Sequence, residues 1–204
     1  MNIVQKPVSP NNYREGRQGQ RPDLIVIHVT QGEKGAVAGW FNSPRAQVSA
    51  HYLITKLGEV WRFVDEADTA FHAGDYDINL RSVGLEHEGV GPNYRPNEAQ
   101  LEASVKLAGQ ICKRWNLEPN GATIQPHRAF RATRCPADFP MERYISMVEQ
   151  EVESAEQEVG EPQNREVRLF DPRTNEPIGV GTLVAGTDKV YIKSLNIDFT
   201  SDTK

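Results

Sequence analysis

The chain has 204 residues, of which 38% are hydrophobic and 25% charged, and its formal net charge is -5. These values fit one globular domain with a substantial core plus an appendage. The negative charge argues against broad nucleic-acid binding, which needs many Lys and Arg contacts to phosphates. No apolar run approaches the roughly 18 residues of a membrane span, and residues 1–7 lack the charged-then-apolar pattern of a secretion signal. We therefore expect a protein made in the cytoplasm without an export signal of its own and without membrane insertion.

The amino-terminal part predicts an arm, a strand and a helix. Proline, asparagine and glycine punctuate residues 1–20, which we expect to form an irregular arm. The apolar run over residues 24–27 predicts a buried strand that ends at His28. Apolar residues that share one helical face predict a short helix over residues 32–43.

The middle of the chain predicts a hairpin, a strand and a long helix. Two β-rich runs, residues 48–56 and 59–64, are separated by a Leu-Gly turn signal and predict the hairpin. A further strand is expected over residues 82–88. The long helix is expected over residues 97–117, with Asn97 as its cap.

The carboxy-terminal part predicts a helix, a linker and a small β-rich appendage. The helix is expected over residues 140–159, and its acidic end, residues 149–158, is typical of a solvated face that grades into a linker. We assign residues 1–159 to the main domain with its arm, 160–165 to the linker and 166–204 to the appendage.

The appendage contains three short β-rich runs, over residues 167–170, 178–184 and 190–193, which predict three strands. About forty residues is near the lower limit for a segment that folds alone. We therefore expect the appendage to serve targeting, docking or dimerisation, by packing on the main domain or on a second chain.

The two cysteines lie in different contexts. Cys112 lies on the apolar face of the predicted helix 97–117, where it would pack as a small hydrophobe. Cys135 lies in a basic loop, where Arg131 and Arg134 would favour the thiolate that a metal requires. The alternative is a disulfide between the two cysteines, which would abolish a metal site.

His127 and Cys135 carry the strongest chemical signal, because an imidazole and a thiolate are zinc ligands once a third donor joins them. His28, at the end of the predicted strand, is the candidate third donor. Three protein ligands leave the fourth tetrahedral position open, which is typical of a catalytic zinc site and indicates a hydrolase. The spacing alone decides little, because a lone histidine beside an apolar strand is more often a structural residue.

The interpretation of these residues depends on five sequence blocks that follow one another along the chain. The blocks are Ile25-Val26-Ile27-His28-Val29-Thr30, Val48-Ser49-Ala50-His51-Tyr52-Leu53-Ile54, Phe71-His72-Ala73-Gly74, Ser82-Val83-Gly84-Leu85-Glu86-His87-Glu88-Gly89 and the loop from His127 to Cys135. Over residues 20–150 the chain thus resembles the type 2 N-acetylmuramoyl-L-alanine amidases, a group that includes phage amidases and peptidoglycan recognition proteins. The resemblance implies an α/β fold, with a mixed central β-sheet flanked by helices. It also implies a Zn2+ ion at the floor of a groove that holds a peptidoglycan stem peptide.

The resemblance implies roles for five residues. His28, His127 and Cys135 match the family's metal ligands. Glu86 matches the glutamate that handles protons, and a carboxylate near an attacking water suits that role. The alternative is a strand carboxylate that faces solvent, like Glu88 on the same face of the strand. Thr133 stands where phage enzymes have a lysine, and its hydroxyl would support the oxyanion.

The resemblance also bears on Ala50 and on three further histidines. Ala50 stands where phage enzymes have a tyrosine, so Glu86 would take over that role and the chain looks like a hybrid of two branches. His51 and His72 match positions near the groove and are candidates for substrate contact, with a structural hydrogen bond as the alternative for His51. His87 should point away from Glu86 and serve packing.

The expected function is zinc-dependent hydrolysis of the amide between N-acetylmuramic acid and L-alanine, as in an endolysin or autolysin. One alternative is a non-hydrolytic peptidoglycan-binding module with an idle metal site. Another is an intracellular amidase that recycles soluble muropeptides. A lysin would act on the cell wall after release through a partner that opens the membrane.

Overall fold

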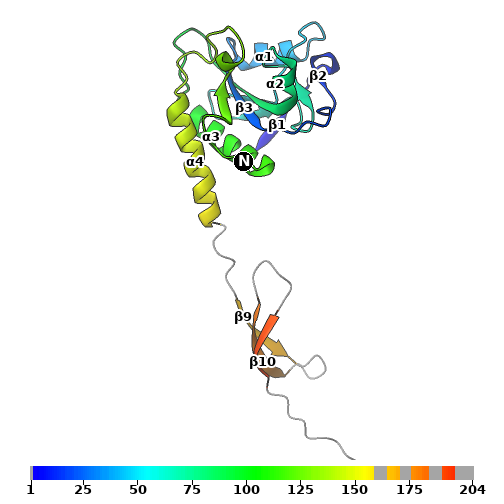
Figure 1. Ribbon diagram of the computed structural model, residues 1–204, viewed down its shortest axis with the longest axis vertical. Coiled ribbons are helices and arrows are strands. Elements are labelled where there is room, and N and C mark those ends of the chain that lie inside the picture. Colours follow the sequence, from blue (N-terminus) through cyan, green and yellow to red (C-terminus); the bar gives the residue numbers. More distant parts are fainter. Residues whose placement is uncertain (1, 159–164, 171–175, 184–189, 196–204) are drawn as a thin grey trace, which may run out of the picture. The chain divides into compact units, whose positions relative to one another are not determined.

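The computed structural model describes residues 2–158, 165–170, 176–183 and 190–195. The chain divides into two compact units, Met1–Glu153 and Ser154–Lys204. The first unit is built on a central sheet with helices against it (Figure 1). The α/β fold predicted from the sequence is therefore confirmed, whereas the predicted domain boundaries stay predictions.

The central sheet of the first unit has six strands in the order β1-β5-β4-β7-β3-β8. They are β1 (Ile3–Gln5), β5 (Val60–Arg62), β4 (Tyr52–Ile54), β7 (Ser82–His87), β3 (Leu24–Val29) and β8 (Ile124–Pro126). Strands β4 and β5 are antiparallel, and every other neighbouring pair is parallel. Because β7, β3 and β8 are parallel neighbours, their carboxyl ends meet at one edge of the sheet, where ligands bind in such sheets.

Helices cover both faces of this sheet. α3 (Glu98–Trp115) and α4 (Met141–Glu158) pack on one face, where their apolar side chains share a core with Ile25, Ile27 and Val29 of β3. α1 (Lys34–Phe41) packs on the other face, in a second core with Leu53 of β4. Because side chains alternate along a strand, His28 points toward the α1 face. The site is therefore built on the side that α3 and α4 do not cover.

Most predicted elements of the first unit are present, several with shorter bounds. The hairpin shortens to β4 and β5, and its turn contains Gly58 at φ +77°, a conformation that suits glycine. α3 begins where the sequence indicated, because the Asn97 side chain accepts a hydrogen bond from the backbone N–H of Gln100 at 2.9 Å. The predicted cap is therefore confirmed.

The prediction of an irregular arm over residues 1–20 was wrong in part. β1 pairs in parallel with β5, with Ile3 opposite Val60, and so adds an edge strand to the sheet. A 3-10 turn (Pro10–Asn12) leads into β2 (Tyr13–Arg14), which pairs with β6 (Thr69–Ala70). These short strands form because they pair with strands that are distant in the sequence, and no local sequence pattern predicts such pairing.

The second unit contains the three predicted strands. β9 (Arg165–Phe170), β10 (Pro177–Leu183) and β11 (Val190–Leu195) form an antiparallel sheet in the order β11-β10-β9. The predicted linker falls on residues 160–164, which lie outside the described residues, while residue 165 already belongs to β9. The expected role of the appendage, residues 166–204, in targeting, docking or dimerisation stays a prediction.

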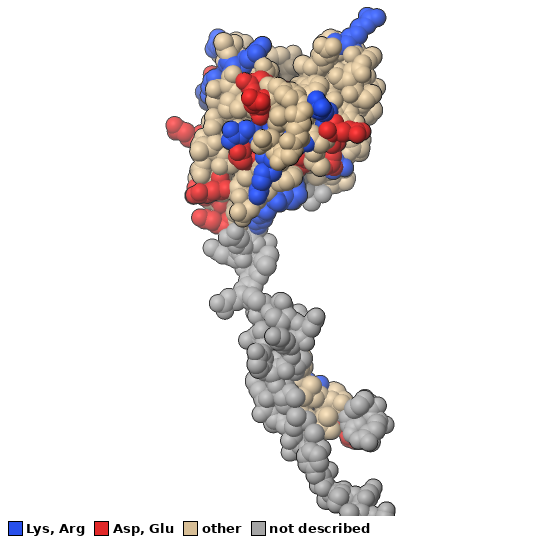
Figure 2. Space-filling model, turned by 45° about the vertical axis from the view of Figure 1, so that its right-hand side comes forward, with Lys and Arg blue, Asp and Glu red and all other residues tan. Residues whose placement is uncertain are grey.

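The surface of the first unit mixes both signs of charge. On the face shown in Figure 2, lysine and arginine side chains are interspersed with aspartate and glutamate among uncharged residues. Within the described part of the chain, no helix is both long and apolar enough to cross a membrane.

Candidate active site

Three potential metal donors meet at the carboxyl edge of the sheet. His28 lies near the end of β3, His127 begins the 3-10 turn (His127–Ala129) directly after β8, and Cys135 lies in the loop that follows. Their ligand atoms all lie within 4.8 Å of one another. Parallel pairing of β3 with β8 aligns Ile27 with Pro126, so the two histidines follow neighbouring positions. The fold thus brings His28 together with residues 99 and 107 positions later in the chain.

Each histidine of this group uses its Nε2 atom for a contact away from the cysteine. His28 Nε2 lies 3.0 Å from His72 Nδ1, and His127 Nε2 lies 3.1 Å from the carbonyl oxygen of Ala73. His28 Nδ1 lies 3.9 Å from Cys135 Sγ. Burial lowers the pKa of His28 and of His127, with like charges on neighbouring histidines a further cause at His28. Both rings are thereby held in the neutral form that a metal ligand requires.

Cys135 is a free thiol with a raised pKa. Its Sγ atom accepts a hydrogen bond from the backbone N–H of Val29 at 3.3 Å. Burial, followed by the carboxylate of Glu86, raises the pKa of Cys135 to about 12, and Arg128 opposes this shift. Arg131 and Arg134 are not among the groups that shift this pKa, so the expectation that they would favour the thiolate is not supported; the hydrogen bond from Val29 and the charge of Arg128 are the groups that oppose burial.

The disulfide alternative is contradicted by the structure. Cys112 is a free thiol on α3, only 1% exposed, and it packs in the core as the sequence predicted. Cys135 lies instead at the edge of the sheet, beside His28. The two thiols therefore remain separate.

Glu86 on β7 lies opposite His28 in the parallel register with β3. Its Oε2 atom is buried and, among the residues that the structure describes, has no hydrogen-bond partner. Burial raises the pKa of Glu86 to about 8. A buried carboxylate oxygen without a partner is costly and calls for an explanation, such as a role in proton transfer or an ion close by.

A cavity of about 450 Å³ opens onto these groups. The three donors and Glu86 line it together with His72. α1 supplies an apolar wall, in which Val37 is buried and Trp40 is 53% exposed. The cavity therefore pairs a polar floor with an apolar wall, which is typical of ligand sites.

Thr133 lies close to the donors in sequence but does not line this cavity. The residue is exposed, and its hydroxyl oxygen accepts a hydrogen bond from the backbone N–H of Cys135 at 3.2 Å. The hydroxyl hydrogen remains available as a donor. An oxyanion role for Thr133 stays a prediction.

His51 is fully buried, and its ring nitrogens already have neighbours. The backbone N–H of Gly84 donates to Nδ1 at 2.9 Å, and Nε2 lies 3.2 Å from the carbonyl oxygen of Asp68. Arg17 Nη2 lies 2.9 Å from the same Nε2. Burial, and then the Arg17 charge, lower the pKa of His51 to about 3. This geometry favours the structural alternative for His51 over substrate contact.

Arg17 itself is a buried residue that the sequence did not single out. Its guanidinium donates to the backbone carbonyls of Glu66, Asn79, Leu80 and Ser82 at distances from 2.7 to 3.3 Å. Arg17 is only 5% exposed, and burial lowers its pKa to about 10. Arg17 thereby links the amino-terminal arm to residue 66 and to the segment 79–82, which leads into β7.

His87 points away from the cavity, as strand alternation predicted. Its Nδ1 lies 3.0 Å from the carbonyl oxygen of His28 and its Nε2 lies 2.7 Å from Ser104 Oγ of α3. Its ring packs against Phe139 and Tyr144. His87 therefore belongs to the core under α3 and α4.

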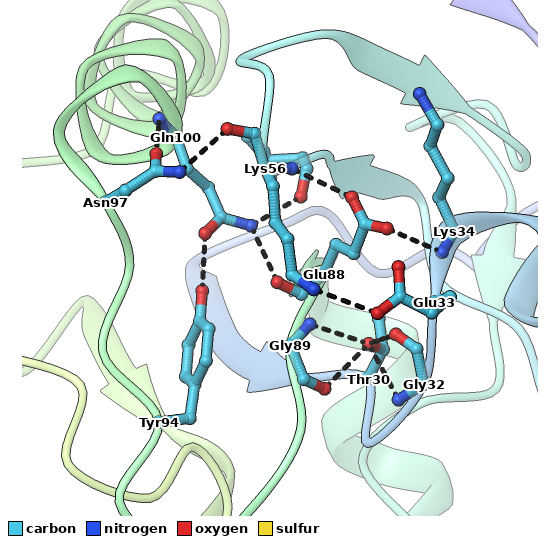
Figure 3. Close-up of polar contacts among 11 residues, drawn as sticks. Thr30, Gly32, Glu33, Lys34, Lys56, Glu88, Gly89, Tyr94, Asn97 and Gln100 are labelled. Carbon is cyan, nitrogen blue, oxygen red and sulfur yellow. Dashed lines mark hydrogen bonds and ion pairs between the residues drawn. The ribbon is translucent and has the colours of Figure 1, made fainter.

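Glu88, two residues after Glu86, is the centre of a polar network that the sequence did not predict (Figure 3). It is 4% exposed, and its carboxylate accepts from the backbone N–H groups of Lys34 at 2.9 Å and Lys56 at 2.8 Å. Lys56 also forms an ion pair with Glu33 at 2.9 Å. Glu88 therefore ties the start of α1 to the turn between β4 and β5. The sequence feature that pointed to Glu88 was its two-residue spacing from Glu86, which places both side chains on the same face.

Comparison with known protein families identifies the family of the chain. Residues 18–138 match the family Amidase_2, described as N-acetylmuramoyl-L-alanine amidase. The chain belongs to this family. The resemblance inferred from the five sequence blocks is thereby confirmed.

Two relatives have names that agree with this family. "N-acetylmuramoyl-L-alanine amidase A" of Achromobacter lyticus is 33% identical over 113 residues, which cover 54% of this chain and 62% of that protein. Endolysin PlyTW of Staphylococcus phage Twort is 24% identical over 135 residues, covering 61% of this chain and 28% of that protein. The chain therefore spans less than two thirds of the length of either relative.

Solved structures share the fold of the first unit. An endolysin N-acetylmuramoyl-L-alanine amidase from Clostridium intestinale has a TM-score of 0.58 at 20% identity, covering 71% of this chain and 93% of that chain. A mutant endolysin from Bacillus subtilis has a TM-score of 0.60 at 22% identity, covering 72% of this chain and 99% of that chain. At these identities the likeness shows the fold.

Proposed function

We propose that this protein hydrolyses the amide between N-acetylmuramic acid and L-alanine in peptidoglycan, with a zinc ion held by His28, His127 and Cys135. The observation that carries the proposal is the meeting of these three donors, in one cavity, with a carboxylate oxygen of Glu86 that has no hydrogen-bond partner among the described residues. Membership of the amidase family and the names of the relatives support the reaction and the substrate.

The donor set fits zinc. Two imidazole nitrogens and one thiol sulfur within 4.8 Å of one another are the ligand types of tetrahedral zinc sites, and three protein ligands leave one position open. The high pKa of Cys135 does not oppose this assignment, because a coordinated thiol is deprotonated by the cation itself. When bound, zinc would polarise the scissile carbonyl and lower the pKa of a water molecule.

The side chains of the chain account for the proton transfers. In its carboxylate form, which a nearby cation favours, Glu86 would take a proton from the water as the water oxygen adds to the carbonyl carbon, and would return one to the amide nitrogen as the C–N bond breaks. The products are the lactyl carboxylate of the sugar and the free amino group of L-alanine. Thr133, whose hydroxyl hydrogen is available, would donate a hydrogen bond to the developing oxyanion.

The cavity supplies the positioning. The wall formed by α1, with Val37 and Trp40, is apolar and suits the methyl and ring surfaces of a muramyl peptide. Because the substrate is part of the cell wall, we propose that the enzyme acts there, after release through a partner that opens the membrane.

The test is digestion of purified peptidoglycan with the zinc-loaded protein, followed by mass spectrometry of the released fragments. We expect stem peptides that begin with L-alanine, lost on chelation and restored by added zinc. Binding to intact glycan without release would instead indicate a binding module. Cleavage of soluble muropeptides alone would indicate a recycling enzyme.

The ligand assignment has its own test, which does not depend on turnover. Cys135→Ala removes one of three donors, and we expect the purified variant to lose bound zinc while it keeps its fold, measured by elemental analysis and circular dichroism. The matched control is Cys112→Ala, which alters a thiol in the core and should retain zinc. Zinc retained in Cys135→Ala would refute Cys135 as a ligand.

A further inference from the structure

A line of buried polar side chains runs from His28 away from the proposed metal position. His28 Nε2 lies 3.0 Å from His72 Nδ1, and His72 Nε2 lies 3.1 Å from Ser82 Oγ. Ser82 Oγ lies 2.6 Å from the carbonyl oxygen of Ile78 in α2 (Tyr76–Arg81). His28, His72 and Ser82 are 2%, 9% and 0% exposed, so water does not compete for these bonds.

The last acceptor fixes the direction of every bond in the line. A carbonyl oxygen only accepts, so the Ser82 hydroxyl donates to Ile78 and its oxygen is left to accept from His72 Nε2–H. A neutral imidazole carries one donor and one acceptor, so His72 Nδ1 accepts from His28 Nε2–H. The lone pair of His28 then lies on Nδ1, the atom that faces Cys135 Sγ at 3.9 Å.

We propose that His72 is a positioning residue which, together with Ser82, holds the proton of His28 on Nε2 and so presents Nδ1 to the metal. The inference rests on the proposed function, because it assigns His28 as a ligand. It gives His72 a different role from the substrate contact expected from the sequence. Both ring nitrogens of His72 are already engaged, so a substrate could bond to the ring only by breaking the line.

The backbone around His72 is built to hold its ring in place. The N–H groups of His72 and Ala73 both donate to Asn79 Oδ1 of α2, at 3.1 and 2.8 Å. A Cβ atom at Gly84 of β7 would lie 2.6 Å from His72 Cγ, so the ring lies directly against the strand backbone where only glycine fits. α2 and β7 therefore fix both the position and the far nitrogen of this ring.

His127 has the same tautomer as His28, but a different contact determines it. Its Nε2 lies 3.1 Å from the carbonyl oxygen of Ala73, which only accepts, so the proton is on Nε2 and Nδ1 is free. The same rule predicts the opposite tautomer for His87, whose Nδ1 lies 3.0 Å from the carbonyl oxygen of His28. His87 thus provides an internal reference for the experiment.

The experiment is long-range proton–nitrogen NMR of the 15N-labelled, metal-free full chain at neutral pH, which distinguishes the two tautomers of each histidine. We expect His28, His72 and His127 as the Nε2–H form and His87 as the Nδ1–H form. Single histidine variants assign the signals. A Nδ1–H form at His28 or at His72 would overturn the inference.

Zinc affinity, measured by competition with a chromogenic chelator, provides the second readout. His72→Asn keeps an acceptor oxygen near the place of Nδ1, and we expect its zinc affinity to stay close to that of the unaltered protein. His72→Leu removes the acceptor, and Ser82→Ala removes the group that orients His72, so we expect losses of about 10- to 100-fold. Far-UV circular dichroism checks that each variant is folded.

The outcomes separate the inference from the proposed function. Equal zinc affinity in His72→Leu and the unaltered protein, with a raised KM for peptidoglycan, would overturn the inference and restore substrate contact. The absence of zinc binding by the unaltered protein would overturn it as well. If the protein binds zinc but cleaves no peptidoglycan, the proposed function fails, while the tautomers and the affinities still decide the role of His72.

Discussion

Glu86 in β7 and Glu88, one residue after the end of β7, lie two residues apart, but their carboxylates have opposite surroundings. Both oxygens of Glu88 accept backbone hydrogen bonds, from Lys34 and from Lys56 (Figure 3). Glu86 has a buried Oε2 atom that no hydrogen bond reaches within the described chain, and its pKa is raised to about 8. A satisfied buried carboxylate holds structure together, whereas an unsatisfied one keeps its capacity to bind and transfer a proton.

The largest effect that this comparison predicts is on turnover. Glu86→Gln replaces the proposed proton carrier with an amide of the same shape, and we expect activity to fall about 10²- to 10⁴-fold, the usual contribution of general acid–base catalysis. Release of stem peptides from peptidoglycan measures it, with zinc content as the control. A variant with full activity would remove Glu86 from the mechanism.

The next effect is a pH dependence of stability in the metal-free protein. Glu86 keeps its proton up to a pKa of about 8 in the folded chain, against an ordinary value of 4.5, so the unfolded chain binds fewer protons between these values. Folded stability should therefore fall as pH rises from 4.5 to 8, whereas Glu86→Gln should not show this loss. The gap should reach a few kcal/mol, at about 1.4 kcal/mol per pH unit as an upper bound.

Urea unfolding of both proteins in a chelator, near pH 5 and near pH 8, checks this prediction. The variant should gain stability relative to the unaltered protein only at the higher pH. A gap of the same size at both pH values would mean that the Glu86 pKa is not raised.

Glu88→Gln should act on stability instead. One acceptor oxygen becomes an N–H₂ group that faces a backbone N–H, and we expect a loss of about 1–3 kcal/mol for the unpaired buried donor. Zinc content should not change. Urea unfolding measures the loss, and Glu59→Gln is the matched control, because Glu59 forms an exposed ion pair with Lys34. Exposed pairs contribute about 0–1 kcal/mol, so a similar loss in both variants would contradict a special role for Glu88.

The smallest effect concerns Thr133. Thr133→Ala removes one hydroxyl donor, and we expect a loss of about 0.5–1.5 kcal/mol of transition-state stabilisation, or roughly a 2- to 10-fold drop in kcat/KM. Thr133→Ser keeps the hydroxyl and should retain most activity. An equal drop in both variants would assign the effect to the methyl group instead of the oxyanion.

The elements that were predicted from the sequence are those with a clear local sequence pattern. β3 is a continuous apolar run, and α3 has a helical period with Asn97 as its cap, so both were predicted near their observed bounds. β1 and β8 have three residues each and exist because β5 and β3 pair with them. α2 was missed because six residues hold too few apolar positions for a period, although Asp75 caps it by accepting from Ile78 N–H at 3.0 Å.

In the candidate site, too, some features were predicted from the sequence and others were not. His28, His127, Cys135 and Glu86 were predicted from blocks of sequence, and the fold gathers them. Their hydrogen-bond partners were not predicted, because these depend on how β7 and α2 come together in space. One signal was available: Gly84 interrupts a buried strand, and a glycine there indicates that another group approaches the backbone closely.

The buried contacts of Arg17 bear on how a minimal catalytic fragment should be cut. The family match begins at residue 18, one position after this guanidinium. A fragment trimmed to that boundary would lack β1 and would leave the carbonyl groups of Glu66, Asn79, Leu80 and Ser82 without their donor. Each of these hydrogen bonds contributes about 0.5–1.5 kcal/mol net, against a typical total stability of about 5–15 kcal/mol. A catalytic fragment that keeps residues 1–17 should therefore be more stable than one trimmed to the family boundary.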